Sequence, residues 1–441
     1  MHTPEELERR IAATQTAQKA WASFTIHHRS GILRQAAALL RRDVQSLAAI
    51  ATREMGKTLV QAEAEVSKCA TCLEFYADNA PSFLAADQVA TEAAESFVIY
   101  EPVGTVLAIM PWNYPFWQVI RFAAPALAAG NAILLKHADN VPQCALELEA
   151  LLVSAGLPEG LVANIFIEPD QVERVLSDDR VGAVTFTGST RAGSAVAQIA
   201  GRAIKKSVLE LGGSDPFIIL ADADLEAAVS AAVKARFQNN GQSCIASKRF
   251  LVEAAIADEF VDRFAQATAE LRVGNPMDRT TDVGPMAKEA IRRELDALVR
   301  ASVADGAVVR AGGGELSSDG LYFHPTVLDH VTRHMPVATE ETFGPVAAVM
   351  RVADLGEAIA LANSSPYGLG ATVWTTSQAS ARTAAAQLQA GAVVVNGVVA
   401  SDPRLPFGGV KRSGYGRELS VHGLREFTVA KSVSIVTQPS N

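Results

Sequence analysis

Two kinds of segment alternate along this chain, and the alternation limits its fold more than any other feature of the sequence. Short apolar runs, such as residues 104–110 and 182–186, are followed by Ala-rich amphipathic stretches, such as residues 191–200. Buried parallel strands separated by covering helices have this pattern. The sequence therefore predicts an α/β protein built on parallel sheets.

The pattern changes partway along the chain, and this indicates more than one domain. Residues 1–90 have mainly helical spacing. Strands are expected at residues 206–211 and 216–220, and a second α/β set begins near residue 225. A chain of 441 residues is long enough for two or three domains at about 150 residues each. We place the boundary near Gly212.

Charge and composition exclude several classes of protein. With 39 Lys and Arg against 48 Asp and Glu, the chain is acidic and repels phosphate backbones, so we expect no nucleic-acid partner. The longest apolar stretch, residues 122–135, is interrupted by Pro125 and Gly130 and is too short for a membrane span. Four cysteines and a start without an apolar leader favour a cytoplasmic protein.

Two patterns resemble metal sites without fulfilling their requirements. Cys69 and Cys72 have zinc or redox spacing, but they lie on an amphipathic helix with no second ligand pair nearby. His330 and His334 lack the glutamate of a metalloprotease helix, and Pro336 disfavours a helix there. We expect buried core thiols in the first case, surface histidines in the second, and no metal.

The segment around Gly188 has the geometry of an anion site. A strand ending at Phe186 is followed by Gly188, Ser189 and then a helix, which directs free backbone N–H groups at any pyrophosphate. The standard glycine-rich fingerprints are absent, so an ordinary strand-to-helix turn remains the alternative.

Cys244 is the candidate nucleophile, because it follows Asn240 and Gly241 on a turn while the other cysteines lie in apolar helical patterns. Glu210 ends an apolar strand and is followed by two glycines. This carboxylate is either satisfied by the glycine N–H groups or kept as a base near neutral pH by partial burial. A loop cysteine without a catalytic role is the alternative for Cys244.

Asn113 lies between two prolines in the segment PWNYP at 111–115, at the end of another expected strand. A rigidly held amide suits an oxyanion hole, and a simple rigid turn is the alternative.

These segments, with several others, resemble the aldehyde dehydrogenase superfamily, in the family's order and along nearly the whole chain. Residues 112–131 and 136–145 are further similar to the shorter bacterial succinate-semialdehyde dehydrogenase branch. The matching segments are PWNYP at 111–115, LLKHA at 134–138, FTGST at 186–190, LELGG at 209–213, GQSC at 241–244, EETFGPV at 340–346, NSSPYGLGATVW at 363–374 and PFGGVKRSGYGRE at 406–418.

The resemblance implies oxidation of an aldehyde to a carboxylic acid with NAD(P). Cys244 as thiolate would attack the aldehyde carbon, and the Asn113 amide with the Cys244 backbone N–H would hold the oxyanion. Nicotinamide would take the hydride, and Glu210 would activate the water that hydrolyses the thioester. A cysteine-dependent esterase without cofactor turnover and a non-catalytic relative are the other hypotheses.

The resemblance also implies the cofactor contacts. Asp139, three residues after Lys136, would repel a 2′-phosphate, so NAD is expected, with NADP as the alternative. Asp139 could instead cap the helix that starts near Pro142. The residues implied for cofactor binding are Trp112, Lys136, Asp139, Gly188, Ser189, Glu341 and Phe343.

For the substrate, the resemblance implies a short aldehyde with a distal carboxylate, of which succinate semialdehyde is the best single candidate and another small aldehyde the alternative. Arg121, Trp117 and Ser401 match substrate-binding positions. An unpaired guanidinium is costly to bury, so Arg121 faces either a funnel and a carboxylate or a neighbouring acid. Two departures from the family are Ile245 in place of a second thiol and Gln238 in place of an arginine of the longer enzymes.

The implied architecture has a Rossmann-like cofactor domain at 1–83 and 103–211, a catalytic domain at 212–427, and a small β oligomerisation element at 84–102 and 428–441. Residues 96–101 and 430–437 are β-prone runs whose edges need a partner. We therefore expect a homodimer or homotetramer.

Overall fold

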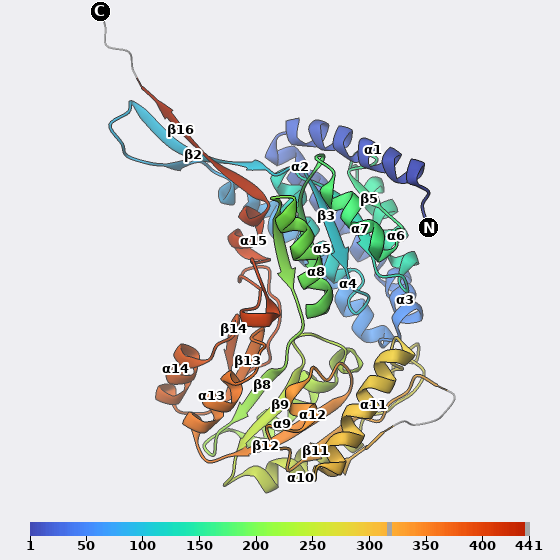
Figure 1. Cartoon of the computed structure of the whole chain (residues 1–441), viewed down its shortest axis with the longest axis vertical. Helices are drawn as coiled ribbons and strands as arrows, with labels where there is room; N and C mark the ends of the chain where they lie inside the picture. The colour runs from blue at the N-terminus through green and yellow to red at the C-terminus, as the bar shows by residue number, and fades with distance from the viewer. Residues whose placement is uncertain (315–319, 437–441) are drawn as a thin grey trace, which may run out of the picture.

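The computed structural model describes residues 1–314 and 320–436, and its two largest sheets lie one above the other (Figure 1). The upper sheet has six strands in the order β15-β7-β6-β3-β4-β5, parallel except for the antiparallel edge strand β15. Its strands are β3 (Thr105–Met110), β4 (Ala132–His137), β5 (Val162–Asn164), β6 (Val181–Thr187), β7 (Lys206–Glu210) and β15 (Gly414–Tyr415).

The order of these strands creates a crevice. The chain runs outward from β3 through β4 to β5, then returns to the other side of β3 for β6 and β7. Ligands of open α/β sheets bind where this direction reverses, at the carboxyl ends of the strands. The point of reversal lies between β3 and β6.

Helices cover this sheet because its strands are apolar on both faces. The connecting helices are α5 (Trp117–Ala129), α6 (Pro142–Ser154), the short pair η1 (Pro169–Gln171) and α7 (Val172–Ser177), and α8 (Thr190–Arg202). The N-terminal part is helical, as expected, with α1 (Pro4–Ser23), α2 (Ile26–Arg42), α3 (Val44–Met55) and α4 (Leu59–Phe83).

The lower sheet has seven strands in the order β10-β11-β12-β9-β8-β13-β14, parallel except at the β10 edge. Its strands are β8 (Asp215–Ile219), β9 (Ser247–Glu253), β10 (Val308–Ala311), β11 (Thr326–Asp329), β12 (Val346–Val352), β13 (Gly370–Trp374) and β14 (Ala392–Val395). The helical segments of this part are α9 (Leu225–Phe237), η2 (Gln238–Gly241), α10 (Ala257–Ala269), α11 (Glu289–Ala304), α12 (Pro336–Thr339), α13 (Leu355–Asn363) and α14 (Gln378–Gln387).

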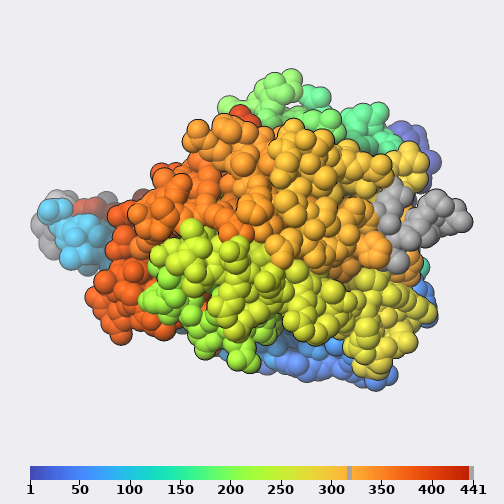
Figure 2. Space-filling view, turned by 90° about the horizontal axis from the view of Figure 1, so that it is seen from below, coloured from blue at the N-terminus to red at the C-terminus, as the bar shows by residue number. Residues whose placement is uncertain are grey.

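The chain then returns to the upper part through η3 (Lys411–Ser413), β15 and α15 (Ser420–Glu426), and α15 contacts α4 and α5. A third sheet follows, in which β2 (Glu95–Pro102) pairs antiparallel with both β1 (Asp87–Gln88) and β16 (Thr428–Ile435). It projects from the body in Figure 1, and β2 and its neighbours stand out at the left of Figure 2. Of the expected oligomerisation segments, residues 437–441 lie outside the described part.

The predicted α/β class and its two parallel sheets are confirmed. Elements that were not expected from the sequence include α5 and the short strands β10 and β11. Among the described residues, none of the helices combines the length and apolarity that a membrane crossing requires.

Candidate active site

Cys244 lies on a tight loop between η2 and β9, and three consecutive residues bend the chain there. Asn239 and Asn240 have φ of 58° and 56°, and Gly241 has φ of +71°. A Cβ at Gly241 would lie 2.4 Å from the carbonyl carbon of Gly344. Only glycine allows this approach, so the loop presses against the segment before β12 while Cys244 faces the space between the sheets.

Two buried cations hold the Cys244 loop through its carbonyl groups. Lys248 Nζ donates to the carbonyls of Ser243, Cys244 and Ala246 at 3.0, 2.8 and 3.1 Å. Arg236 donates to the carbonyl of Gly241 at 2.6 Å. Donors on side chains that are themselves buried fix this loop in one conformation.

Asn113 is brought beside this loop from the end of β3. Its Nδ2 donates to the carbonyl of Gln242 at 3.1 Å, and Asn239 Nδ2 donates to the Asn113 carbonyl at 3.0 Å. Gln118 Nε2 lies 3.5 Å from Asn113 Oδ1 and orients the amide. One Asn113 amide proton is thus directed at the loop, and the second is left for an oxygen bound near Cys244.

A buried ion pair stabilises the PWNYP segment. Glu65 Oε1 accepts from the backbone N–H groups of Phe116 and Trp117 at 2.8 and 2.9 Å, and its other oxygen pairs with Lys57. A carboxylate at the start of α5 satisfies N–H groups that a helix leaves free. The strand end that carries Asn113 is therefore rigid.

Glu210 ends β7 with a buried carboxylate whose two oxygens have no hydrogen-bond partner among the described residues. Burial, and then the nearby Glu418, raise the pKa of Glu210 to about 8, against the opposing charges of Arg121 and Arg417. The alternative in which glycine N–H groups satisfy this carboxylate is wrong, because Gly213 donates to Glu341 Oε1 at 3.0 Å instead. A carboxyl group with this pKa suits a general base near neutral pH.

The surroundings of the Cys244 thiol favour its protonated form. Burial raises its pKa to about 11, and Arg121 and Lys248 act in the opposite direction. Because the thiolate is the reactive form, the thiol must lose its proton before it reacts. Glu210 raises the pKa of Cys244 through its charge, so the two groups lie within electrostatic reach of each other.

The Arg121 side chain both faces a cavity and pairs with a neighbouring acid, the two arrangements expected from the sequence. It lines a cavity of about 800 Å³ that also holds Cys244, and it forms a buried ion pair with Glu418. Its Nη2 lies 3.5 Å from Thr187 Oγ1, and its guanidinium lies 4.8 Å from the Phe407 ring centroid.

Trp117 and Ser401 line the same cavity, together with Lys68. Lys68 Nζ donates to Ser401 Oγ at 2.7 Å and lies 4.1 Å from the Trp117 ring centroid. The substrate residues expected from the sequence therefore meet around one hollow with Cys244.

Most of the expected cofactor residues lie in a second group, at the carboxyl ends of β3, β4 and β6, whereas Glu341 and Phe343 precede β12. Lys136, the next-to-last residue of β4, has no hydrogen bond or ion pair among residues 1–314 and 320–436. Asp139 pairs with Lys288 across 2.6 Å, and this contact lowers the pKa of the Asp139 carboxyl. Asp139 does not cap α6: that part of the expectation is wrong, because Glu54 accepts from the first-turn N–H groups of Gln143 and Cys144.

The turn after β6 leaves donors for an anion. Gly188 N–H donates to the Glu210 carbonyl at 3.0 Å, and Ser189 caps α8 by accepting from Ala192 N–H at 3.3 Å. The N–H groups of Thr190 and Arg191 have no partner within the helix. Free N–H groups at the positive end of a helix can bind an anion such as a pyrophosphate.

The two groups of residues meet at Glu341. Its Oε1 lies 3.6 Å from Lys248 Nζ, so a residue expected to contact ribose also touches the cation that holds the Cys244 loop. Phe343 and Trp112 lie nearby, with ring centroids 5.8 Å apart in an edge-to-face contact. A planar ring bound in this region would lie beside the Phe343 and Trp112 side chains.

Residues of the site that were not found from the sequence include Lys68, Lys248 and Glu418. Each acquires its role through contacts with distant parts of the chain. The only sequence signal was a charged side chain inside an apolar run, as at Lys248 at the start of β9.

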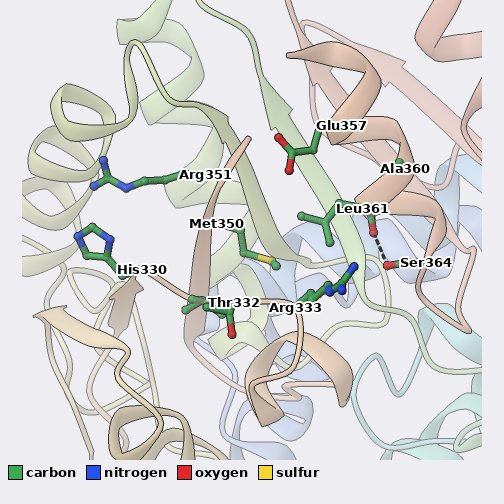
Figure 3. Close-up of a pocket in the computed structure, with 10 residues that line it drawn as sticks. His330, Thr332, Arg333, Met350, Arg351, Glu357, Ala360, Leu361 and Ser364 are labelled. Atoms are coloured by element: carbon green, nitrogen blue, oxygen red, sulfur yellow. Dashed lines mark hydrogen bonds between the residues drawn. The ribbon is translucent and has the colours of Figure 1, made fainter. Parts of the chain in front are cut away.

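The patterns set aside in the sequence analysis lie elsewhere. Cys69 and Cys72 are fully buried, which confirms the expectation of core thiols. His330 lines a separate cavity of about 480 Å³ with Arg333, Arg351 and Glu357 (Figure 3). Arg351 is paired with Asp258 and Asp329. The described residues contain no cluster of metal-ligating side chains.

Comparison with known proteins gives a family match along the chain: residues 1–433 match the model described as the aldehyde dehydrogenase family. The chain is 49% identical over 434 residues to the probable succinate-semialdehyde dehydrogenase (NADP+) of Synechocystis sp., covering 98% of this chain and 96% of that protein. It is also 49% identical over 436 residues to succinate-semialdehyde dehydrogenase (NADP+) 1 of Mycobacterium tuberculosis, covering 98% and 95%.

A solved structure agrees with these relatives. The succinic semialdehyde dehydrogenase from Streptococcus pyogenes in complex with NADP+ superimposes with a TM-score of 0.96 and 36% identity, over 99% of this chain and 96% of that one.

Proposed function

The chain belongs to the aldehyde dehydrogenase family, and from that premise we propose that it oxidises succinate semialdehyde to succinate at Cys244 with NADP+. The observation that carries this proposal is the cavity of about 800 Å³, which holds the Cys244 thiol together with half-buried Lys68 and buried Arg121. A reactive thiol and positive charge in one small hollow fit a short aldehyde that ends in a carboxylate. The names of the relatives in Synechocystis and Mycobacterium support the same substrate.

The residues divide the chemistry between them. Cys244, as the thiolate, forms a bond to the aldehyde carbon, and the oxygen becomes an oxyanion held by the Asn113 amide and the Cys244 backbone N–H. A nicotinamide cofactor, when bound, supplies the acceptor for the hydride that leaves this carbon. Cys244 then carries a thioester, and Glu210 takes a proton from the water that hydrolyses it.

The residues at the crevice fit such a cofactor. The backbone N–H groups of Thr190 and Arg191 would hold the pyrophosphate. Lys136, which is unpaired, and Glu341 would each contact one of the two riboses. Phe343 and Trp112 would flank the nicotinamide. These residues favour a dehydrogenase, because a cofactor-free esterase does not need a cofactor-binding crevice.

The choice of cofactor depends on Asp139. From the sequence alone its carboxylate repels a 2′-phosphate and favours NAD. Lys288 pairs with it at 2.6 Å. Burial lowers the pKa of Lys136, and the charge of Lys288 acts in the same direction, so the two ammonium groups lie within electrostatic reach of each other. Two ammonium groups suit a phosphate, and the named relatives use NADP+, so we propose NADP+ as the preferred cofactor.

The test is a comparison of kcat/KM for succinate semialdehyde and butanal, each with NADP+ and with NAD+. Butanal has the same number of carbons and no carboxylate. We expect reduced cofactor in every case, the highest value for succinate semialdehyde with NADP+, and a carboxylate preference of about tenfold or more. Equal values for the two aldehydes would contradict the substrate, and a preference for NAD+ would contradict the cofactor.

We also propose a homo-oligomer formed through β2 and β16, with the domain division given by the family resemblance. Most side chains of β16 are exposed, and Val429 is 51% exposed at this projecting element. The unpaired backbone N–H and C=O groups of an exposed edge strand favour pairing with another chain. All four cysteines are free, which supports a reducing compartment such as the cytoplasm. Sedimentation at micromolar concentration tests the assembly, and a monomer alone would contradict it.

A further inference from the structure

Lys68 is a half-buried cation that forms no ion pair with an acid among the described residues. It lies on α4, lines the cavity of Cys244, and donates to Ser401 Oγ at 2.7 Å. Among the described residues, its ammonium group forms no ion pair with a carboxylate. Glu65 and Asp402 act on Lys68 through their charge, but Glu65 pairs with Lys57, and both oxygens of Asp402 accept from Arg404, at 2.9 and 2.6 Å.

Three buried cations near the cavity do form ion pairs with carboxylates. Lys57 pairs with Glu65, Arg121 with Glu418, and Lys248 with Glu341. A buried charge without a partner is costly, and it is retained where a ligand supplies the opposite charge. Burial, and then Arg121, lower the pKa of Lys68 to about 8, which an arriving anion would reverse.

Lys68 also lies within reach of a small molecule held at Cys244. Arg121 shifts the pKa of both groups through its charge, so the ammonium and the thiol lie around the same guanidinium. Arg121 itself is already anchored to Glu418, and the ring of Trp117 supports Lys68 at 4.1 Å. The cavity therefore offers one cation that is fixed in position and free to accept a carboxylate.

We infer that Lys68, with the hydroxyl of Ser401, binds the distal carboxylate of the substrate and sets the preference for acidic aldehydes. This inference rests on the proposed function and adds its specificity-determining residue. In the complex, Lys68 Nζ donates to one carboxylate oxygen and Ser401 Oγ donates to the other. Arg121 stays with Glu418 and contributes its field from one side.

The test is Lys68→Met, which keeps the length of the side chain and removes its charge. We expect KM for succinate semialdehyde to rise about 10- to 100-fold, the range for a lost hydrogen bond to a charged group. The KM for butanal should change less than about threefold, and kcat should change little for either aldehyde. Titration calorimetry with succinate, in the absence of cofactor, should show the same loss of affinity.

Lys234→Met is the matched control, because Lys234 lies exposed at the rim of the cavity and has no hydrogen bond or ion pair there. It should leave both KM values nearly unchanged. Lys68→Arg keeps the charge and should recover part of the succinate affinity. If Lys68→Met does not fold, Ser401→Ala, with a smaller rise in KM for the acid alone, tests the same site.

The outcomes separate the two proposals. Wild-type protein without preference for succinate semialdehyde over butanal overturns the proposed substrate, and this inference with it. A wild-type preference that survives in Lys68→Met overturns this inference alone. An equal rise in KM for both aldehydes assigns Lys68 to packing and also overturns it.

Discussion

The charged groups of this protein lie in two environments that face one another. The outer edge, defined by Lys136, Asp139, Ser189 and Lys288, is open to water: the Asp139 side chain is 74% exposed. The inner cleft is defined by Cys244, Glu210, Arg121 and Lys248. The exposed fraction of the residue is 3% or less for Glu210, Arg121 and Lys248. Water screens charges at the outer edge, whereas in the cleft each charge acts strongly on its neighbours.

The difference predicts how much each residue contributes. Removing a charge from the outer edge should change affinity modestly, because solvent replaces the lost partner. Removing one from the cleft changes the protonation and position of the groups that react. The predictions below follow this order.

The largest effect is expected in the cleft at Cys244. Cys244→Ala removes the group that bonds to substrate, so dehydrogenase activity should fall by about 1,000-fold or more. Alkylation of the site by iodoacetamide should disappear, while the melting temperature stays close to that of the wild type. Cys144→Ala, in α6 and far from the reacting groups, is the control and should remain active. Near-normal activity in Cys244→Ala would contradict the mechanism.

The second effect is the pH dependence of the wild type. Burial raises the pKa of Glu210 to about 8 and that of Cys244 to about 11, and both act in their deprotonated forms. A raised pKa means that the active form accumulates as pH rises. The Cys244 thiolate acts in the steps up to hydride transfer, which determine kcat/KM, so kcat/KM should increase from about pH 6 to pH 9, by about tenfold per pH unit at the acidic end. Outer-edge groups should leave this profile unchanged. A flat profile would show that no buried acid controls the rate.

Lys248 is a positioning residue, and its loss should have an intermediate effect. Lys248→Met removes the donor to three carbonyls of the Cys244 loop, and kcat should fall about tenfold. Because Lys248 also lowers the pKa of Cys244, the alkylation rate of the thiol should shift to higher pH. Lys431→Met, on projecting β16, is the control. An unchanged alkylation profile would reduce Lys248 to a packing role.

The smallest effect is expected at the outer edge. Lys288→Met leaves Asp139 without its counter-ion, so kcat/KM with NADP+ should fall about three- to tenfold while that with NAD+ changes less. Adding Asp139→Ser to Lys288→Met should restore part of the NADP+ value. Equal changes with both cofactors would mean that the Asp139–Lys288 pair has no part in cofactor choice.

Sequence reasoning found the residues whose chemistry depends on local structure. Cys244 lies on a turn that asparagine and glycine permit, Asn113 is held between two prolines, and Glu210 ends an apolar strand. In each case the neighbours in sequence already restrict the backbone. The parallel strands β3 and β6 were predictable for a similar reason, because both are continuous apolar runs.

The rest depends on distant contacts or lacks a periodic signal. All residues of α5 are buried, so the helix has no polar face and its 3.6-residue period is invisible in the sequence. Strand β11 has four residues, too few for a pattern. Lys68 and Ser401 are 333 positions apart in the chain, and only the fold shows that they meet.

The measurement that tests the account most directly is a single turnover of Glu210→Gln with succinate semialdehyde and NADP+, followed by mass spectrometry of the intact protein and its peptides. Without the buried base for hydrolysis, we expect a burst of reduced cofactor and a succinyl group on the peptide that contains Cys244. A burst without an acyl adduct would contradict covalent catalysis at Cys244. Loss of the burst would show that Glu210 is needed before the hydride step, as the base for the thiol alone.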